Sequence, residues 1–275
     1  MNYRHIYHAG NFADVFKHAV LTLVIERLTA KDAGFAVIDT HAGAGLYDVT
    51  SAEAQRTGEF ARGYGQVAGT LPAALRAYAA AVAALNPQAG LAVYPGSPAL
   101  IRHLLRPQDR LVACELHPED AASLKRHMAG DARVQCHARD GYQALKAFLP
   151  PRERRGLVLI DPPFEDPDER RRVVRALGQA HERWPTGIYA IWHPIKSQGE
   201  KLLFHGELAN TGIRRLLAAE MLIDAGDRAD RLNGCGIVIV NPPHGLDRAL
   251  SAVLPALHRM LSDQGGIAVE WVVPE

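Results

Sequence analysis

The sequence predicts an α/β protein built on a doubly wound, mostly parallel sheet of seven strands. Most of the strand-like segments are continuous apolar runs, as strands buried on both faces of a sheet are. Helical patterns lie between them, and this alternation is typical of a doubly wound sheet. The predicted strands span Phe35 to Asp39, Leu111 to Glu115, Arg133 to Cys136, Leu157 to Asp161, Ile188 to Trp192, Cys235 to Asn241 and Ile267 to Val273.

A long helix precedes the first of these strands. Apolar residues recur at helical spacing from Phe12 to Val24, while His18 falls off that stripe. Asn11 is placed to cap this helix, with Asp14 three residues later. Ser97 is predicted to cap a second helix, whose first residue is a proline. The other predicted helices span Pro118 to Met128, Tyr142 to Phe148, Asp168 to Glu182 and Leu246 to Leu261.

The chain between the first strand and Tyr94 interrupts the alternation of strands and helices. It contains a polar stretch from Gly58 to Gly69 and then an alanine-rich helix from Pro72 to Leu85. We therefore interpret residues 49–92 as a small helical insertion subdomain. Residues 1–48 and 93–275 form the core domain that carries it.

Composition excludes several classes of protein. The longest apolar runs, such as Gly156 to Ile160, are far shorter than the ~20 residues that span a bilayer, and the N-terminus does not resemble a signal peptide. We expect a soluble, cytoplasmic protein with no membrane partner. The three cysteines lack C-x-x-C spacing, so neither a zinc site nor a disulfide framework is indicated. The formal net charge is +1, so any contact with nucleic acid must be a local patch.

Small residues follow the first strand from Asp39 to Gly45, where the backbone can come close to a ligand at the carboxyl ends of the strands. Gly43 lies in this turn. The turn suits a nicotinamide dinucleotide as well as S-adenosylmethionine, although Asp48 stands where the dinucleotide fingerprint has its third glycine. By itself the turn leaves both cofactors open.

Acidic residues lie at or just beyond the ends of three consecutive strands. Glu115 is placed to accept hydrogen bonds from both ribose hydroxyls of a nucleoside cofactor. Asp140, followed by Gly141, is placed to accept one from an adenine amine. Together with Asp39 these carboxylates form an acidic rim, which suits a sulfonium cation and fits a pyrophosphate poorly. The rim favours S-adenosylmethionine over NAD.

The fourth strand runs directly into Asp161, Pro162, Pro163 and Phe164. The two prolines stop the strand and remove two backbone donors, which leaves a rigid loop of acceptors. Methylation of adenine N6 needs such acceptors, because the amine lone pair is conjugated into the ring and one proton must leave. The Asp161 carboxylate and the Pro162 carbonyl are candidate acceptors, and the Phe164 ring offers a stacking face for an unstacked base.

A near copy of this loop, Asn241-Pro242-Pro243-His244, follows the strand that ends near Val240. His244 replaces the expected large aromatic residue, and the strand before it is not the fourth one. We interpret Asn241 as a structural turn and Asp161 as the reactive position.

The loop from Asp161 to Phe164 resembles the (Asp/Asn)-Pro-Pro-(Tyr/Phe/Trp) motif of amino-group methyltransferases. The whole chain resembles the large-subunit (23S) ribosomal RNA adenine N6-methyltransferase J family. The family motif is commonly written with Tyr in its fourth place, so Phe164 keeps the stacking face and loses a hydroxyl. The segments that carry the family resemblance are Tyr3 to His18, Asp39 to Gly45, Tyr94 to Pro98, Glu115 to Pro118, Ile160 to Pro163 and Trp271 to Glu275.

The resemblance implies a Rossmann-like class I methyltransferase core. Its activity would be transfer of a methyl group from S-adenosylmethionine to the N6 of an adenine in 23S ribosomal RNA, giving N6-methyladenosine and S-adenosylhomocysteine. It also implies Asp161 as the proton acceptor and Tyr3 near the RNA. The expected cofactor contacts are His18, His41, Gly43, Ser97, Glu115, Asp140, Gly141 and Asp161.

Basic residues near the predicted cleft are candidates for contacts with phosphate groups. Tyr3 and Arg4 are better candidates for touching RNA, because an N-terminal arm can close over a flipped base. We expect the RNA to be protein-free or an early assembly intermediate, and the enzyme to be a monomer. The basic candidates are Arg152, Arg154, Arg155, Arg170 to Arg172, Lys196, Lys201, Arg214 and Arg215.

Other functions remain open from the residues alone. DNA adenine or a protein amide presents the same planar amine. An NAD-dependent oxidoreductase and a non-catalytic RNA-binding module are alternatives outside the amino-methyltransferases. His18 and His41 taken alone would be structural histidines. His5, His8 and His18 have no carboxylate or cysteine at a ligand spacing, and amine methylation by a sulfonium needs no metal, so we expect no metal cofactor.

Overall fold

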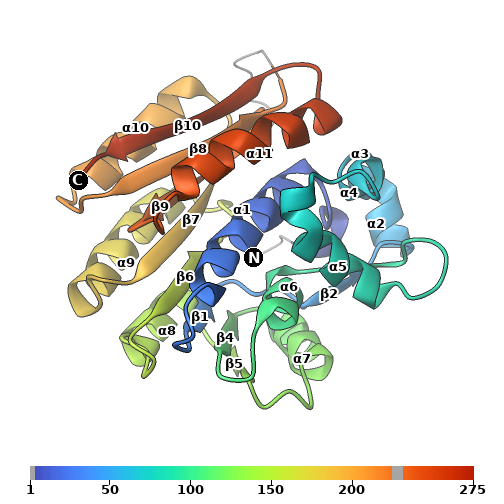
Figure 1. The fold of residues 1–275 in the computed structure, drawn as a ribbon, viewed down its shortest axis with the longest axis horizontal. Helices are drawn as coiled ribbons and strands as arrows, with labels where there is room; N and C mark the ends of the chain where they lie inside the picture. The colour runs from blue at the N-terminus through green and yellow to red at the C-terminus, as the bar shows by residue number, and fades with distance from the viewer. Residues whose placement is uncertain (1–3, 225–231) are drawn as a thin grey trace.

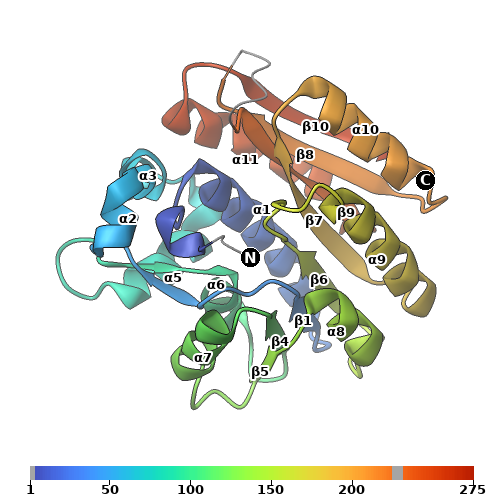
Figure 2. The ribbon, with the colours of Figure 1, turned by 180° about the vertical axis from the view of Figure 1, so that it is seen from behind.

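The computed structural model describes residues 4–224 and 232–275 and is built on a central twisted sheet (Figures 1 and 2). The predicted α/β architecture is confirmed, but the main sheet has eight strands instead of seven. In spatial order the strands are β10 (Gly266–Val273), β8 (Leu216–Leu222), β9 (Gly234–Val240), β7 (Ile188–Ile195), β6 (Gly156–Ile160), β1 (Ala36–Asp39), β4 (Arg110–Glu115) and β5 (Val134–Ala138).

The strand missing from the prediction is β8. Its sequence, LLAAEML, consists of residues with good helix propensity and contains no β-branched residue. Pairing with β9 on one side and β10 on the other makes it a strand, and six of its seven residues are buried. Tertiary pairing therefore overrides local propensity here.

Six of the eight strands point in one direction, and β9 and β10 run against them. After β1 the chain builds β4 and β5 on one side and then crosses to β6 on the other. The order reverses beside β1, and ligands of such sheets bind at the carboxyl ends of the strands at this switch point.

Helices cover both faces of the sheet, as Figures 1 and 2 show from opposite sides. No helix in the described part of the chain has the length and apolar character of a membrane span. One face carries α1 (Phe12–Thr29), α6 (Ser97–Leu104), α7 (Pro118–His127) and α11 (Leu246–Leu261). The other carries α8 (Gly141–Phe148), α9 (Glu169–Arg183) and α10 (Gln198–Ala209).

Helix α1 begins as predicted, because the Asn11 side chain accepts a hydrogen bond from the Asp14 amide at 2.9 Å. The apolar stripe gives an incomplete picture of its surroundings. α1 lies among the sheet, α6, α11 and α5 (Arg76–Leu85), so polar residues off the stripe are buried as well. His18 is one of them, with 0% exposure.

A small antiparallel pair, β2 (Leu46–Asp48) and β3 (Val93–Pro95), frames the segment interpreted as an insertion. Its buried residues, including Tyr64 and Tyr78, join the same hydrophobic core as α1. The helices between the two strands are α2 (Ala52–Thr57), α3 (Glu59–Arg62), α4 (Tyr64–Val67), the 3-10 turn η2 (Ala73–Leu75) and α5. A short 3-10 turn η1 (His5–Tyr7) lies at the other end of the described chain, before α1.

Gly156 begins β6 with a φ of +153° beside the backbone of Ala36. A β-carbon there would overlap the Ala36 carbonyl oxygen. We expect Gly156→Ala to lower the free energy of unfolding by about 1–3 kcal/mol, as overpacking does. Gly178→Ala is the matched control, because α9 leaves open space at that position and alanine favours a helix. Urea unfolding of both variants tests this, and equal stability of the two would contradict it.

Candidate active site

A cleft of about 490 Å³ opens at the carboxyl ends of β1, β4, β5, β6 and β7. This volume suits a small organic ligand. All four residues of the predicted catalytic loop line it. Six of the predicted cofactor contacts line it as well, namely His41, Gly43, Ser97, Glu115, Asp140 and Gly141.

An ion-pair chain leads from the catalytic loop into the protein. The Lys17 ammonium lies 2.6 Å from an Asp161 carboxylate oxygen and 2.8 Å from one of Asp14. The other Asp14 oxygen lies 2.9 Å from His5 Nε2 and accepts from the Gly10 amide at 2.9 Å. Sequence reasoning missed Lys17 and Asp14 as site residues. The pattern that could have indicated them is a pair of opposite charges three residues apart within an otherwise apolar helix.

Burial and neighbouring charges shift the pKa values of Asp14 and Lys17, the two buried members of this ion-pair chain, in opposite directions. Burial alone would raise the pKa of Asp14, but His5 and Lys17 hold it well below its usual value. Burial alone would lower the pKa of Lys17, but Asp14 and Asp161 hold it well above its usual value. Asp14 is therefore a carboxylate and Lys17 an ammonium at neutral pH.

Phe164 presents an aromatic edge of the cleft. It adopts a φ of +51°, a left-handed conformation that a large side chain rarely takes. Its ring packs edge-on against Trp192, with 5.9 Å between centroids, and against Phe204 of α10 at 6.5 Å. Trp192 also lines the cleft and was not among the predicted site residues. The two rings form an apolar wall beside Asp161.

Glu115, one of the predicted cofactor contacts, organises one side of the cleft. Its carboxylate accepts hydrogen bonds from the Gly43 amide at 2.8 Å and the His117 amide at 2.7 Å. Burial raises its pKa despite these bonds. The glycine turn after β1 is thus tied to the end of β4.

Asp140 and His41 line the cleft as well. Asp140 caps α8 by accepting from the amides of Tyr142 and Gln143, and its second oxygen lies 3.8 Å from Arg172. Burial lowers the pKa of His41 to about 4, so its ring is neutral at neutral pH.

Two expectations, one about Ser97 and one about Asp39, were wrong. Ser97 does not cap α6, because it is the first helical residue and its hydroxyl donates to Asp39 at 2.7 Å. Asp39 does not belong to the acidic rim, because it has 0% exposure and lies beneath the turn. Burial raises its pKa to about 7. The carboxylates that face the cleft include Glu115, Asp140 and Asp161.

The structure does not bring every predicted contact to the cleft. His18 is buried behind it, where Nδ1 lies 2.9 Å from the Tyr94 hydroxyl. Tyr3 lies outside the described residues. Arg4 lines a neighbouring hollow and pairs with Glu119 at 2.8 Å.

Most of the predicted phosphate contacts lie elsewhere. Arg155 precedes β6, so it lies at the opposite edge of the sheet from Asp161, where it donates to the Leu28 carbonyl in the last turn of α1 and to the Ala33 carbonyl after that helix. Arg152 and Arg154 lie at that same edge, as do Arg214 and Arg215, which precede β8. Of the predicted basic set, Arg172 and Lys196 line the cleft.

Asn241 is a structural turn, as predicted. β9 runs against β7, so its end lies at the amino edge of the parallel strands, away from the cleft. The Asn241 amide donates to the carbonyls of Pro185 and Gly187 at 2.8 and 2.9 Å. Strand direction therefore separates the two copies of the motif.

Comparison with known proteins identifies the family. A family model described as ribosomal RNA large subunit methyltransferase D, RlmJ, matches residues 32–273. The ribosomal RNA large subunit methyltransferase J of Escherichia coli is 42% identical over 280 residues, and that of Haemophilus influenzae 41% over 281, each match covering 100% of both chains. A crystal structure of a Legionella pneumophila protein is 30% identical, with a TM-score of 0.87 over 96% of this chain and 98% of that one. The chain therefore belongs to the RlmJ family of ribosomal RNA large subunit methyltransferases.

Proposed function

We propose that this protein transfers a methyl group from S-adenosylmethionine to the exocyclic N6 of an adenine in 23S ribosomal RNA. The observation that carries the proposal is the Asp161 loop, which lines a nucleoside-sized cleft with its carboxylate held by Lys17. Membership of the RlmJ family supports ribosomal RNA as the acceptor over DNA adenine or a protein amide.

The cleft residues fit S-adenosylmethionine better than NAD. The turn after β1 leads into β2 and not into a helix, so no helix N-terminus follows it to hold a pyrophosphate. The carboxylates of Glu115 and Asp140 suit the ribose and adenine of the cofactor. S-adenosylmethionine supplies the methyl group as an electrophilic carbon on a sulfonium.

Asp161 is suited to hold the amine and to take its proton. With S-adenosylmethionine bound as the methyl donor, the Asp161 carboxylate would accept a hydrogen bond from the N6 amine and would take the proton that N6 loses on methylation. The Lys17 ammonium, 2.6 Å from a carboxylate oxygen of Asp161, holds this side chain in position at the cleft. The Pro162 carbonyl is the second acceptor, and Phe164 and Trp192 hold the plane of the base.

The RNA approaches, in this proposal, across Arg172 and Lys196, with Tyr3 and Arg4 on the N-terminal arm. We propose that the enzyme acts as a monomer on protein-free RNA or on an early assembly intermediate, because the bases of such an RNA are exposed and can reach the cleft. A ribosomal RNA substrate implies a cytoplasmic enzyme.

Residues 49–92 act, we further propose, as an insertion subdomain that orders this arm. The Glu59 carboxylate lies 3.0 Å from His8 Nδ1 and accepts from the Asn11 side chain at 3.0 Å. The Tyr64 amide donates to the Gly10 carbonyl at 2.8 Å. Gly10 in turn donates to Asp14, so the insertion reaches the ion-pair chain through the arm.

Asp161→Asn keeps the shape of the side chain and removes its charge. We expect methyl transfer from labelled S-adenosylmethionine to protein-free 23S RNA to fall at least about 100-fold, as loss of a proton acceptor does, while cofactor binding is retained. Asn241→Ala, in the second copy of the motif, is the control and should keep its turnover per folded molecule. Nuclease digestion identifies the product as N6-methyladenosine. Unchanged turnover of Asp161→Asn would contradict the proposal.

Lys17→Met should destabilise the protein by about 3–5 kcal/mol at pH 7, because it leaves two carboxylates without their buried partner. The lowered pKa of Asp14 gives stability above pH ~4, the unfolded value, which is lost as pH falls through the folded value. The raised pKa of Lys17 gives stability below pH ~10.4, which is lost above its folded value. Denaturant unfolding of wild type and Lys17→Met should therefore show the full difference in the free energy of unfolding between pH ~4 and pH ~10.4. The difference should become smaller on strong acidification.

Glu59→Gln should loosen the N-terminal arm. We expect faster hydrogen exchange at residues 4–11 and lower methyl transfer to RNA, with cofactor affinity less affected. Glu53→Gln is the matched control, because Glu53 is exposed on α2 of the same insertion. Equal exchange rates in the two variants would show that Glu59 does not hold the arm.

A further inference from the structure

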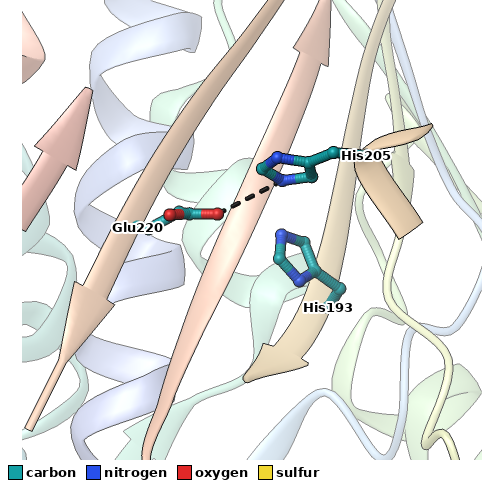
Figure 3. A group of neighbouring side chains, drawn as sticks. All are labelled: His193, His205 and Glu220. Atoms are coloured by element: carbon teal, nitrogen blue, oxygen red, sulfur yellow. Dashed lines mark ion pairs between the residues drawn. The ribbon is translucent and has the colours of Figure 1, made fainter. Parts of the chain in front are cut away.

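Three ligating side chains meet inside the protein on the sheet face that is covered by α10 (Figure 3). His193 comes from β7, His205 from α10 and Glu220 from β8. One nitrogen or oxygen of each lies within 4.8 Å of the others. Their exposed fractions are 2%, 7% and 2%, so each is more than nine-tenths buried.

The inward-facing atoms of this cluster are not satisfied by hydrogen bonds. His193 Nε2, His205 Nε2 and Glu220 Oε1 have no hydrogen-bond partner among the described residues. His205 Nε2 and Glu220 Oε1 lie 3.2 Å apart, an ion-pair distance without hydrogen-bond geometry. Buried polar atoms without partners are rare, and three that converge on one point suggest a common partner.

The surroundings of His193 prepare Nε2 as a ligand. Its Nδ1 faces the Pro194 carbonyl at 3.4 Å, which favours the tautomer with the proton on Nδ1 and the lone pair on Nε2. A β-carbon at Gly236 would overlap the imidazole, so this glycine leaves the ring its space.

We propose that His193, His205 and Glu220 form a zinc site. Two imidazoles and one carboxylate, with water in the fourth position, are a ligand set that zinc takes at open sites with three protein ligands. Tetrahedral bonds of ~2.0–2.1 Å place donor atoms roughly 3.3 Å apart. The 3.2 Å between His205 and Glu220 already matches this spacing, and His193 closes on the ion.

Lys201 is the counter-ion of the cluster and its competitor. Its ammonium lies 2.9 Å from Glu220 Oε2, which leaves Oε1 for the metal. Lys201 and Glu220 both line an adjoining cavity of about 330 Å³. This cavity gives an ion and its water a path of entry, and gives the Lys201 side chain room to turn away from a dication.

The site would stabilise the wall behind the catalytic loop and take no part in methyl transfer. Phe204, the neighbour of His205 on α10, packs against both His193 and Phe164, with ring centroids 5.1 and 6.5 Å away. An ion that joins α10 to β7 and β8 would therefore hold Phe204 against the loop.

The test is zinc titration of chelator-treated protein against a chromophoric competitor, with cobalt(II) absorption as a probe of tetrahedral geometry. We expect one ion per chain, and a loss of affinity of about ten-fold or more in His193→Gln and in His205→Gln. His181→Gln, on α9 outside the cluster, is the matched control and should bind as wild type does. Lys201→Met should bind zinc more tightly, because the competing cation is gone.

Zinc should also raise the Tm of the wild-type protein and leave that of His193→Gln unchanged. Circular dichroism and S-adenosylmethionine binding establish that each variant is folded. Absence of stoichiometric zinc binding, or equal affinity in wild type and His193→Gln, would overturn the proposal. None of these measurements uses methyl transfer, so the outcome is independent of the proposed function.

Discussion

The Lys17 ammonium lies in the protein interior between two carboxylates, and the active site depends on this charge balance. An unpaired buried ion is destabilising by several kcal/mol, so Asp14 and Asp161 must both be in place. The balance joins α1 to the loop after β6, which are 144 residues apart in sequence. It also extends through Asp14 to His5, so the N-terminal arm and the Asp161 carboxylate belong to one electrostatic unit.

The direction of the strands decides which polar residues take part in the site. Six strands point one way, and the cleft lies at the carboxyl edge of these strands. Asp161 lies at this edge, whereas Arg155, six residues earlier, lies at the other and donates to the Leu28 carbonyl at the end of α1. The same rule makes Asn241 a turn residue, because β9 runs in the opposite direction.

Successive side chains of β7 point to opposite faces of the sheet. Trp192 and Pro194 point into the cleft, while His193 between them points toward α10 and the proposed zinc site. From the sequence we expect no metal cofactor, because the N-terminal histidines lack a ligand spacing and methylation by a sulfonium needs no metal. The proposed zinc site is a different one and takes no part in methyl transfer. The proposed zinc ligands come from three elements, so no local spacing could indicate them.

The sequence by itself determined the α/β class, seven of the eight strands and most of the cleft. Continuous apolar runs, and motifs placed directly at strand ends, are local signals, and the carboxyl ends of parallel strands must gather at one edge. Only the tertiary structure decided that β8 is a strand, that His18 and Asp39 lie beneath the site, and that Lys17 pairs with Asp161. Each of these depends on burial and on partners that are distant in the sequence, and neither can be predicted from the residues adjacent in the sequence.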